Sequence, residues 1–276
     1  MEINAAEFNL VRQLVLRESA IKLEPGKEYL VENRLETVAQ DAGFTSVSEL
    51  IRALNQEGPE LEYKVVEAMT TNETSFFRDW HPFECLKNQI VPELIRLRDH
   101  TRKLRIWSAA CSTGQEAYSL VMLLRDHFPQ LSDWEVEILG TDLSLDALSK
   151  AEAATYRGLE VNRGLPAPLL LKHFDRNGGS WRLKTPLRES VRFRQHNLIG
   201  DWSVIGKERF DLILLRNVLI YFDAGIKKQI LGRLRDHLAD DGYLFLGSSE
   251  TVAFVDDTYE RAFRDETTAC YQPRTR

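Results

Sequence analysis

The sequence predicts an α/β fold in which a doubly wound, mostly parallel sheet follows an all-helical N-terminal domain and carries an inserted β subdomain. Two observations indicate this fold. Apolar residues up to residue 75 recur only at helical spacing, and after residue 101 strand-length apolar runs alternate with helix-length amphipathic stretches. Such alternation is typical of a parallel sheet with helices on both faces.

Helical periodicity organises residues 1–75, which we expect to form a small helical bundle. Ser46 and Glu49 have the spacing of a capping box before a further helix, and Gly43 ends the stretch before it. Residues 76–100 are predicted to link this domain to the next. The apolar residues at helical spacing are Phe8, Val11 and Val15, then Val31, Leu35, Val38 and Ala42, and finally Leu61, Val65 and Met69.

Residues 101–276 hold the predicted sheet. The last apolar run, TTACYQ, follows no helix of clear period, which makes it a candidate antiparallel edge strand. Residues 158–190 break the alternation: an Asn177-Gly178-Gly179 tip beside the polar run SWRLKT is a hairpin signal. We expect a small β insertion there. The predicted strands of the sheet lie at 105–110, 135–142, 191–197, 210–217 and 243–249.

Composition excludes several classes of protein. A chain of 276 residues with 43% hydrophobic residues can build a real core, and a net charge of −6 argues against a general nucleic-acid binder. Three distant cysteines give no disulfide framework, and the six histidines have no metal-ligand spacing. Neither a signal core nor a run of ~20 apolar residues is present. We therefore expect a soluble cytosolic protein without a metal.

The ends of the predicted strands are where a doubly wound sheet binds its ligand. The first strand opens into residues 108–116, SAACSTGQE, whose single Gly114 does not make the G-x-G-x-x-G pattern of a dinucleotide site. That loop suits a nucleoside without a diphosphate, or is a plain tight turn. Asp142 ends the second strand, where it could accept hydrogen bonds from ribose hydroxyls or cap the helix near Ser144. Arg216, at the end of a later strand, could equally form a structural ion pair.

Four motifs together resemble one family. TTNETSFFRD, WSAACSTGQEAYS, GTDLSLDAL and LLRNVLIYFD occur in this order and spacing, although the first alone could be an interdomain loop. They resemble the CheR family of chemotaxis-receptor methyltransferases, whose helical N-terminal domain and β insertion this layout also matches. The resemblance implies a Rossmann-like methyltransferase sheet. It also implies transfer of a methyl group from S-adenosyl-L-methionine to receptor glutamates, giving γ-methyl esters and S-adenosyl-L-homocysteine.

The resemblance also implies roles for individual residues. Arg78 and Tyr221 match the residues that the family places beside the transferring methyl group. Glu73 departs from the first motif and is expected to face solvent, whereas Cys111 is expected to be a packing residue. The positions that match the family's cofactor contacts are Asn72, Thr74, Arg78, Glu116, Asp142, Asn197, Leu198, Arg216 and Asn217.

The chemistry implied by the resemblance needs little acid–base catalysis. A glutamate acceptor, with a reference pKa of about 4.3, is already ionised at neutral pH, so no general base is required. The enzyme must align the reactants and exclude water from the nucleophile. We expect Arg78 to orient the acceptor carboxylate and the Tyr221 hydroxyl to fix the geometry of the methyl donor.

Partners are predicted from charge and from the resemblance. The family implies cytoplasmic receptor helices as substrate, recruitment to membrane receptor clusters, and in some members a receptor C-terminal peptide bound on the β subdomain. Nothing in the sequence demands more than a monomer. A related enzyme with another substrate, or a non-catalytic cofactor-binding module, stays open as an alternative. Candidate basic faces, which could equally be solvated helix surfaces, are Lys22, Lys27 and Arg34, and Arg96, Arg98, Arg102, Lys103 and Arg105.

Overall fold

The computed structural model describes residues 3–263 and 268–274, and it divides into two compact units. The smaller unit holds the residues up to Thr71 together with Tyr221–Ile226, and the larger holds Asn72–Ile220 and the residues from Lys227 onward. Among the described residues, no helix combines the length and the apolar character that crossing a membrane requires.

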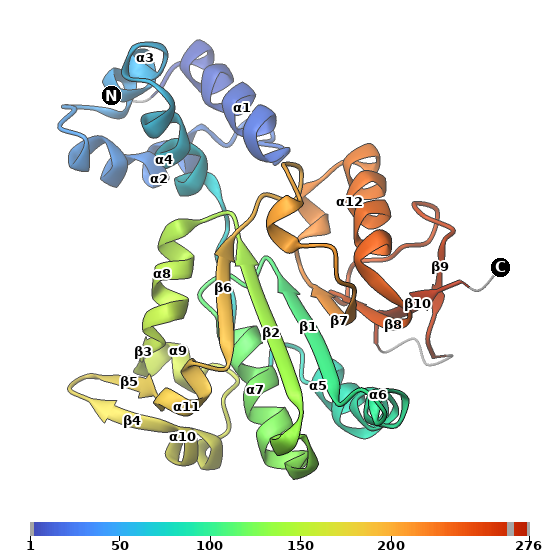
Figure 1. Ribbon diagram of the computed structural model, residues 1–276. Coiled ribbons are helices and arrows are strands. Elements are labelled where there is room, and N and C mark those ends of the chain that lie inside the picture. The colour runs from blue at the N-terminus through green and yellow to red at the C-terminus, as the bar shows by residue number, and fades with distance from the viewer. Residues whose placement is uncertain (1–2, 264–267, 275–276) are drawn as a thin grey trace. The chain divides into compact units, whose positions relative to one another are not determined.

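Four helices build the smaller unit (Figure 1). Asn4 caps the first of them, because its side chain accepts hydrogen bonds from the backbone of Ala6 and Glu7 while Glu7 bonds back to the Asn4 N–H. Ser46 caps the third by accepting from the Glu49 N–H at 3.2 Å. The helices are α1 (Ala5–Ser19), α2 (Glu28–Asp41), α3 (Val47–Glu57) and α4 (Pro59–Met69).

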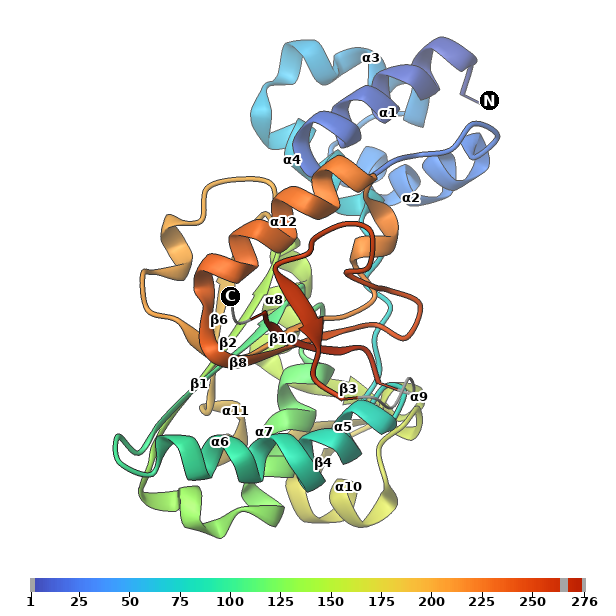
Figure 2. The same ribbon diagram turned by 90° about the vertical axis from the view of Figure 1, so that its right-hand side faces the viewer.

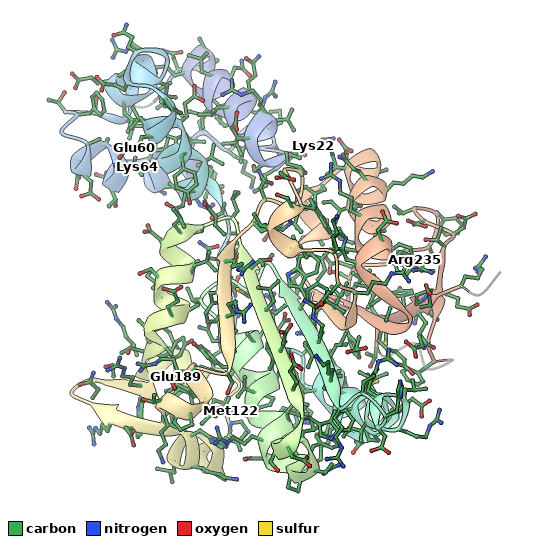
Figure 3. All side chains as sticks on the ribbon, viewed as in Figure 1. Lys22, Glu60, Lys64, Met122, Glu189 and Arg235 are labelled. Atoms are coloured by element: carbon green, nitrogen blue, oxygen red, sulfur yellow. The ribbon has the colours of Figure 1, made fainter. Side chains whose placement is uncertain are left out.

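The predicted apolar stripes fill the core of this bundle, with one correction. Val31 and Leu35 are buried as expected, but α2 ends at Asp41, so Ala42 is an exposed C-cap and Ala39 takes the buried position. Polar residues cover the outer faces: Lys64 and Glu60 pair at 3.0 Å across one turn of α4, where both side chains are exposed (Figure 3).

The larger unit is built on a seven-stranded sheet of order β6-β2-β1-β7-β8-β10-β9. The first five strands in this order are parallel, and β10 is antiparallel to both of its neighbours. The TTACYQ run therefore gives an antiparallel strand as predicted, but β9 and not β10 is the edge; Thr267 lies outside the described residues. The strands are β1 (Lys103–Ala109), β2 (Glu135–Asp142), β6 (Val191–Gln195), β7 (Phe210–Leu215), β8 (Leu238–Leu246), β9 (Tyr259–Arg261) and β10 (Cys270–Pro273).

Helices cover both faces of this sheet. Every residue of β7 is buried, as expected of a central parallel strand. Figure 2 shows α6 and α7 on one side of the sheet and α12 on the other, and Met122 of α7 is buried in the core (Figure 3). The helices and helical turns outside the β subdomain are α5 (His81–Cys85), η1 (Leu86–Ile90), α6 (Val91–Arg98), α7 (Gln115–His127), η2 (Pro129–Asp133), α8 (Leu145–Ala153), η3 (Ser203–Ile205), η4 (Leu219–Tyr221) and α12 (Ala224–His237).

The segment predicted as a linker is itself helical. The helices α5, η1 and α6 follow one another without a break, and η1 has π-helical hydrogen bonding. Pro92 has no N–H and cannot donate the hydrogen bond that a regular helix makes to the preceding turn. This explains why the π-helical turn η1 lies just before it. Leu86, Ile90 and Leu94 are buried in the core of the larger unit.

The predicted β insertion is a three-stranded antiparallel sheet of order β3-β5-β4. Gly178 and Gly179 form the tip between the paired Asn177 and Ser180, as the sequence predicted. Phe76 packs edge-on against the rings of Tyr156 and Phe174, with centroids 5.1 and 5.7 Å away. The subdomain is built from β3 (Thr155–Arg157), α9 (Gly158–Asn162), α10 (Ala167–His173), β4 (Phe174–Asn177), β5 (Ser180–Leu183) and α11 (Thr185–Arg188).

One ion network ties α6 to the sheet at the end opposite the predicted site. The Arg98 Nε donates to Asp211 at 2.7 Å, and its Nη1 donates to Asp241 at 2.8 Å. Asp211 also accepts from the Arg105 N–H at 2.8 Å, and its side chain is only 8% exposed. Arg98 lowers the pKa of the Asp241 carboxyl by hydrogen bonding to its ionised form.

Replacing Arg98 by alanine is expected to lower the free energy of unfolding by about 3 kcal/mol, because Asp211 is left charged and buried without its partner. Because Arg98 holds the pKa of Asp241 below its unfolded value, this pair gives stability that is present at neutral pH and lost as pH falls through the folded-state pKa. The effect of Arg98→Ala should therefore shrink in acid. Urea unfolding at neutral and acid pH measures both.

Arg96→Ala on the same helix is the matched control, because Arg96 pairs with Glu93 on the exposed surface and such pairs contribute little. Equal stability losses for Arg96→Ala and Arg98→Ala would contradict a special role of the buried network.

Candidate functional site

The carboxyl ends of β1, β2, β6 and β7 lie along one edge of the sheet, because these strands are parallel. The segments that leave them carry most of the residues singled out in the sequence.

The segment carrying Arg78 is held in an unusual backbone conformation. Phe77, Asp79 and Trp80 all have φ between 48° and 66°, a left-handed region that non-glycine residues seldom adopt. The Phe77 N–H donates to Ser119 Oγ at 2.9 Å, and Arg78 Nη1 donates to the Glu73 carbonyl at 2.9 Å. Strained backbone of this kind persists only where neighbours hold it, and it is common at functional sites.

Most of the first motif, TTNETSFFRD, precedes Arg78 in this segment. The Asn72 carbonyl accepts from Ser112 Oγ at 2.8 Å, which joins the segment to the loop after β1. Thr74 is half-buried, and Glu73 is 57% exposed as expected. Glu73 pairs with Arg163, and this hydrogen bond lowers the pKa of its carboxyl.

The loop after β1 turns sharply into α7. Ala110, Ser112 and Gly114 have φ of 57°, 51° and 91°. A side chain at Gly114 would place its Cβ 2.9 Å from the Ala151 Cβ, so only glycine allows α7 to start this close to α8. Cys111 is buried, and burial raises the pKa of its thiol, which agrees with the packing role expected for it.

Asp142 joins two of the strand-end loops. Its carboxylate accepts the Ser112 N–H at 2.8 Å and the Ser144 N–H at 3.0 Å. Ser144 and not Asp142 is the N-cap of α8, because its own hydroxyl accepts from the Ala147 N–H. A carboxylate has positions for about four hydrogen bonds, so Asp142 has the chemistry to hold both loops and to accept from ribose hydroxyls.

An ion network around the buried Arg216 connects the first turn of α7 to the segment carrying Arg78. Arg216, whose side chain is 1% exposed, donates to Glu116 at 3.0 Å, to Asp79 at 2.9 Å and to the Arg78 carbonyl at 2.8 Å. Ser108 Oγ donates to the other oxygen of Glu116 at 2.7 Å. Arg216 therefore forms the structural ion pair that the sequence allowed as an alternative, and together with Ser108 it holds the Glu116 carboxylate in place.

The end of β6 combines polar and aromatic groups. Leu198 is buried and Asn197 is half-buried, and the Leu198 carbonyl accepts from Trp202 Nε1 at 3.0 Å. His196 packs against Trp107 and Trp202, and burial lowers its pKa to about 4, so the ring is neutral at physiological pH. The described residues contain no group of His, Cys, Asp and Glu that could hold a metal ion.

The segment after β7 carries Asn217, with a left-handed φ of 59° and a half-buried side chain. Its Oδ1 is buried and has no hydrogen-bond partner among the described residues. Tyr221 is half-buried at the end of η4, in the stretch grouped with the smaller unit. Its pairing with Arg78 at one reaction centre stays a prediction.

Sequence reasoning missed Glu250, which follows β8 and is 6% exposed. Its carboxylate accepts from the backbone N–H groups of Gly247, Asn217, Val218 and Ile220. The signal that pointed to Asp142, an acid just beyond a buried parallel strand, is also present at Glu250.

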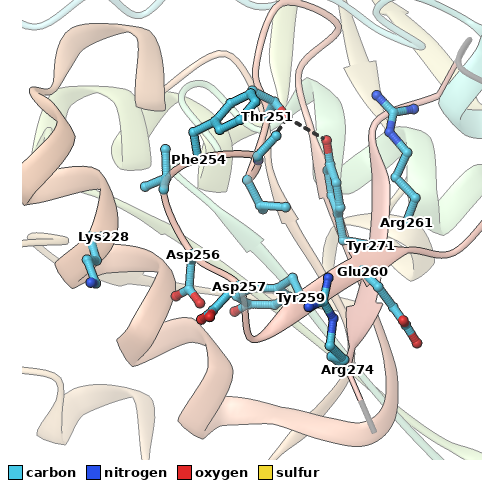
Figure 4. Close-up of a pocket in the computed structure, with 13 residues that line it drawn as sticks. Lys228, Thr251, Phe254, Asp256, Asp257, Tyr259, Glu260, Arg261, Tyr271 and Arg274 are labelled. Atoms are coloured by element: carbon cyan, nitrogen blue, oxygen red, sulfur yellow. Dashed lines mark hydrogen bonds between the residues drawn. The ribbon is translucent and has the colours of Figure 1, made fainter.

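A separate surface pocket of about 580 Å³ lies beside the C-terminal strands (Figure 4). The loop 251–257 forms one wall, and Tyr271, Arg274 and Lys228 contribute from β10, the chain after it and α12. None of the predicted site residues lines this pocket. It is therefore distinct from the edge formed by the strand ends.

Comparison with known proteins gives matches over most of the chain. The SAM binding domain of the CheR methyltransferases matches residues 72–268, and the all-alpha domain of the same proteins matches residues 6–70. Chemotaxis protein methyltransferase 1 of Pseudomonas aeruginosa is 43% identical over 92% of this chain and 93% of its own. Chemotaxis protein methyltransferase Cher2 of Pseudomonas putida is 41% identical over 94% and 95%, and a chemotaxis protein methyltransferase of Vibrio anguillarum is 35% identical over 94% of each chain.

Replacing Arg216 by lysine tests the buried ion network. A single ammonium group cannot span Glu116, Asp79 and the Arg78 carbonyl as the guanidinium does. We expect the free energy of unfolding to fall by about 3 kcal/mol, the size of two lost charge-assisted hydrogen bonds. Chemical denaturation measures the change.

Arg163→Lys serves as the control, since Arg163 is 61% exposed and meets Glu73 in solvent, where pairs contribute little. A stability loss no larger for Arg216→Lys than for Arg163→Lys would show that Arg216 does not hold the segment carrying Arg78.

Proposed function

Since the chain belongs to the CheR methyltransferase family and carries its S-adenosylmethionine-binding domain, we propose that it methylates glutamate side chains of bacterial chemoreceptors. Its enzyme class, an S-adenosylmethionine-dependent methyltransferase of chemotaxis, follows from the family. The acceptor, the products and the roles of individual residues are the proposal. The observation that supports it most is the meeting of Asp142, Glu116 and the Arg78 segment at one edge of the sheet.

The residues at this edge fit the cofactor. Asp142 would accept hydrogen bonds from the ribose, and Glu116 would face the methionine end. Asn197 and Leu198 would flank the adenine, while Asn72 and Thr74 would contact the cofactor from the first motif. The buried Oδ1 of Asn217, for which the described part of the chain offers no hydrogen-bond partner, is an acceptor suited to a cationic ligand. When bound, the cofactor supplies a methyl group on a positively charged sulfur, and this sulfur leaves as a neutral thioether when the methyl group is transferred.

The structure modifies the expectation for Arg216. Its guanidinium is committed to Glu116, Asp79 and the Arg78 carbonyl. We therefore propose that Arg216 acts on the cofactor mainly by holding Glu116, with its Nε, which has no partner among the described residues, as the atom left for a ligand.

The proposed reaction requires orientation more than proton transfer. The acceptor glutamate is ionised at neutral pH, so its oxygen can attack without a general base. Arg78, half-buried in its strained segment, would orient that carboxylate by an ion pair. Too strong an ion pair would stabilise the ground state and slow transfer. The Tyr221 hydroxyl would fix the methyl donor in line with the acceptor.

The candidate basic faces for receptor binding need revision. Arg34 donates to the carbonyls of Met69 and Thr70 and to Thr71 Oγ1, so it closes the end of α4. Burial lowers the pKa of Arg34. Lys22 also pairs with Asp223 at 3.6 Å, although both side chains are exposed. We propose that Lys27, and Lys22 if it exchanges this partner, contact the acidic receptor helices.

The second cluster is largely neutralised by acids. Each of its members, Arg96, Arg98, Arg102, Lys103 and Arg105, forms an ion pair with an aspartate or glutamate. The exposed pairs of Arg96, Arg102 and Lys103 support the solvated-surface interpretation, whereas Arg98 and Arg105 are largely buried in structural ion pairs. A receptor C-terminal peptide could add to an edge of the β subdomain, whose outer strands are β3 and β4, and would bring the enzyme to membrane receptor clusters.

The proposed reaction is tested by incubating the protein with methyl-labelled S-adenosylmethionine and a receptor cytoplasmic fragment. We expect label that is released as methanol by base, the property of a carboxylate ester. A receptor fragment with alanine at the acceptor glutamates is the control and should take up none. Label that persists on this control, or is stable to base, would contradict glutamate esterification.

The alternative of a non-catalytic or differently targeted member has its own signature. Such a protein would bind adenosylhomocysteine but transfer no label to the receptor fragment. Adenosylhomocysteine binding, measured by calorimetry, therefore accompanies the transfer assay.

Replacing Tyr221 by phenylalanine removes only the hydroxyl. We expect kcat to fall by about 10²-fold, the lower end of the cost of losing one well-placed hydrogen bond in the transition state, with little change in adenosylhomocysteine affinity. Steady-state kinetics and calorimetry measure the two effects. Unchanged turnover would remove Tyr221 from the mechanism, and a parallel loss of affinity would make it a cofactor-binding residue only.

A further inference from the structure

Glu250 binds the turn after β7 through both of its oxygens. Its Oε2 accepts the N–H of Gly247 at 2.6 Å and the N–H of Asn217 at 2.7 Å. Its Oε1 accepts the N–H of Val218 at 2.8 Å and that of Ile220 at 3.3 Å. One buried carboxylate therefore joins the end of β8 to three backbone donors of the turn that leaves β7.

Among residues 3–263 and 268–274, the backbone hydrogen bonds of turns and loops include no other acceptor for Asn217, Val218 or Ile220. The chain leaves β7 at Leu215, and Asn217 adopts a left-handed φ of 59°, which directs the following N–H groups away from the strand ladder. A buried N–H without an acceptor is costly. Several N–H groups that converge on one point form a site for an anion, and here the protein supplies that anion itself.

Gly247 allows the close approach of these groups. A Cβ at Gly247 would lie 2.6 Å from Glu250 Oε2 and 2.8 Å from both the N and the Nδ2 of Asn217. Gly247 is not in the left-handed region, so its backbone permits alanine, and a methyl group there requires only that Glu250 and Asn217 shift. The carboxylate, the glycine and Asn217 are thus packed as one unit.

We propose that Glu250 is a positioning residue for methyl transfer, which sets the conformation of the turn that carries Asn217 and leads into Tyr221. This inference rests on the proposed function, because Asn217 and Tyr221 are assigned there. Glu250 acts through the backbone of the turn and needs no contact with the cofactor or the acceptor. A purely structural Glu250 would affect unfolding and leave the kinetics of the folded protein unchanged.

Replacing Glu250 by glutamine tests this inference with little change in size. Glutamine has one acceptor oxygen, and its NH₂ group would face two of the N–H donors, so the turn must rearrange. We expect kcat for the receptor fragment to fall by at least about tenfold, within the ~10²-fold that a displacement of 1 Å costs. The acceptor KM should change little. Amide hydrogen exchange should speed up at Asn217, Val218 and Ile220.

Asp256→Asn is the matched control in the same loop. The Asp256 carboxylate lies in the surface pocket of Figure 4 and accepts from the N–H and Oγ1 of Thr258. This variant makes the same chemical change away from the turn, and its kcat should equal that of the wild type.

The outcomes separate the inference from the proposed function. A wild-type protein that transfers no methyl group overturns the proposed function. An active wild type with a folded, equally active Glu250→Gln variant overturns the inference, even if that variant melts at a lower temperature. If Glu250→Gln does not fold, Gly247→Ala replaces it, since its methyl group pushes against Glu250 and Asn217; wild-type kcat in that variant also overturns the inference.

Discussion

The whole site depends on one constraint: backbone that leaves a parallel sheet must find new hydrogen-bond partners at the edge where the ligand binds. In this protein buried carboxylates supply them. Asp142 receives the N–H groups of Ser112 and Ser144, and Glu250 receives those of the turn after β7. The same acids that support the loops also bring negative charge to this edge, which suits a cofactor with a cationic sulfur.

Arg216 pairs with two further acids and connects their segments to one another. Its guanidinium joins Glu116, which follows β1, to Asp79, beside the proposed catalytic Arg78. The conformation of Phe77–Trp80, with three left-handed residues, is held by this network and by Ser119. A change at Glu116 is therefore expected to reach Arg78, the proposed acceptor-orienting residue, through two hydrogen bonds.

Sequence patterns predicted much of this architecture because they report on local burial and on strand ends. The sequence alone predicts the buried strand before Asn217, the hairpin tip at Asn177-Gly178 and the position of Asp142 at a strand end. Contacts between residues distant in sequence cannot be predicted in this way. The sequence places Arg34 with the surface lysines, whereas its guanidinium caps the end of α4. Likewise, nothing in the sequence indicates that β9 lies outside β10 at the edge of the sheet. Glu250 was missed because its partners lie about thirty residues away, whereas Arg216 could be placed at the edge but its three partners could not be named.

The most direct test of this account is a crystal structure of the protein with adenosylhomocysteine. We predict ribose hydroxyls within hydrogen-bond distance of the Asp142 carboxylate, with Arg216 still bound to Glu116 and Asp79. Density for the ligand elsewhere, for example in the pocket beside Phe254, would contradict the assignment of the site. An Arg216 that leaves both acids to contact the ligand would contradict the view that it organises the site by holding Glu116.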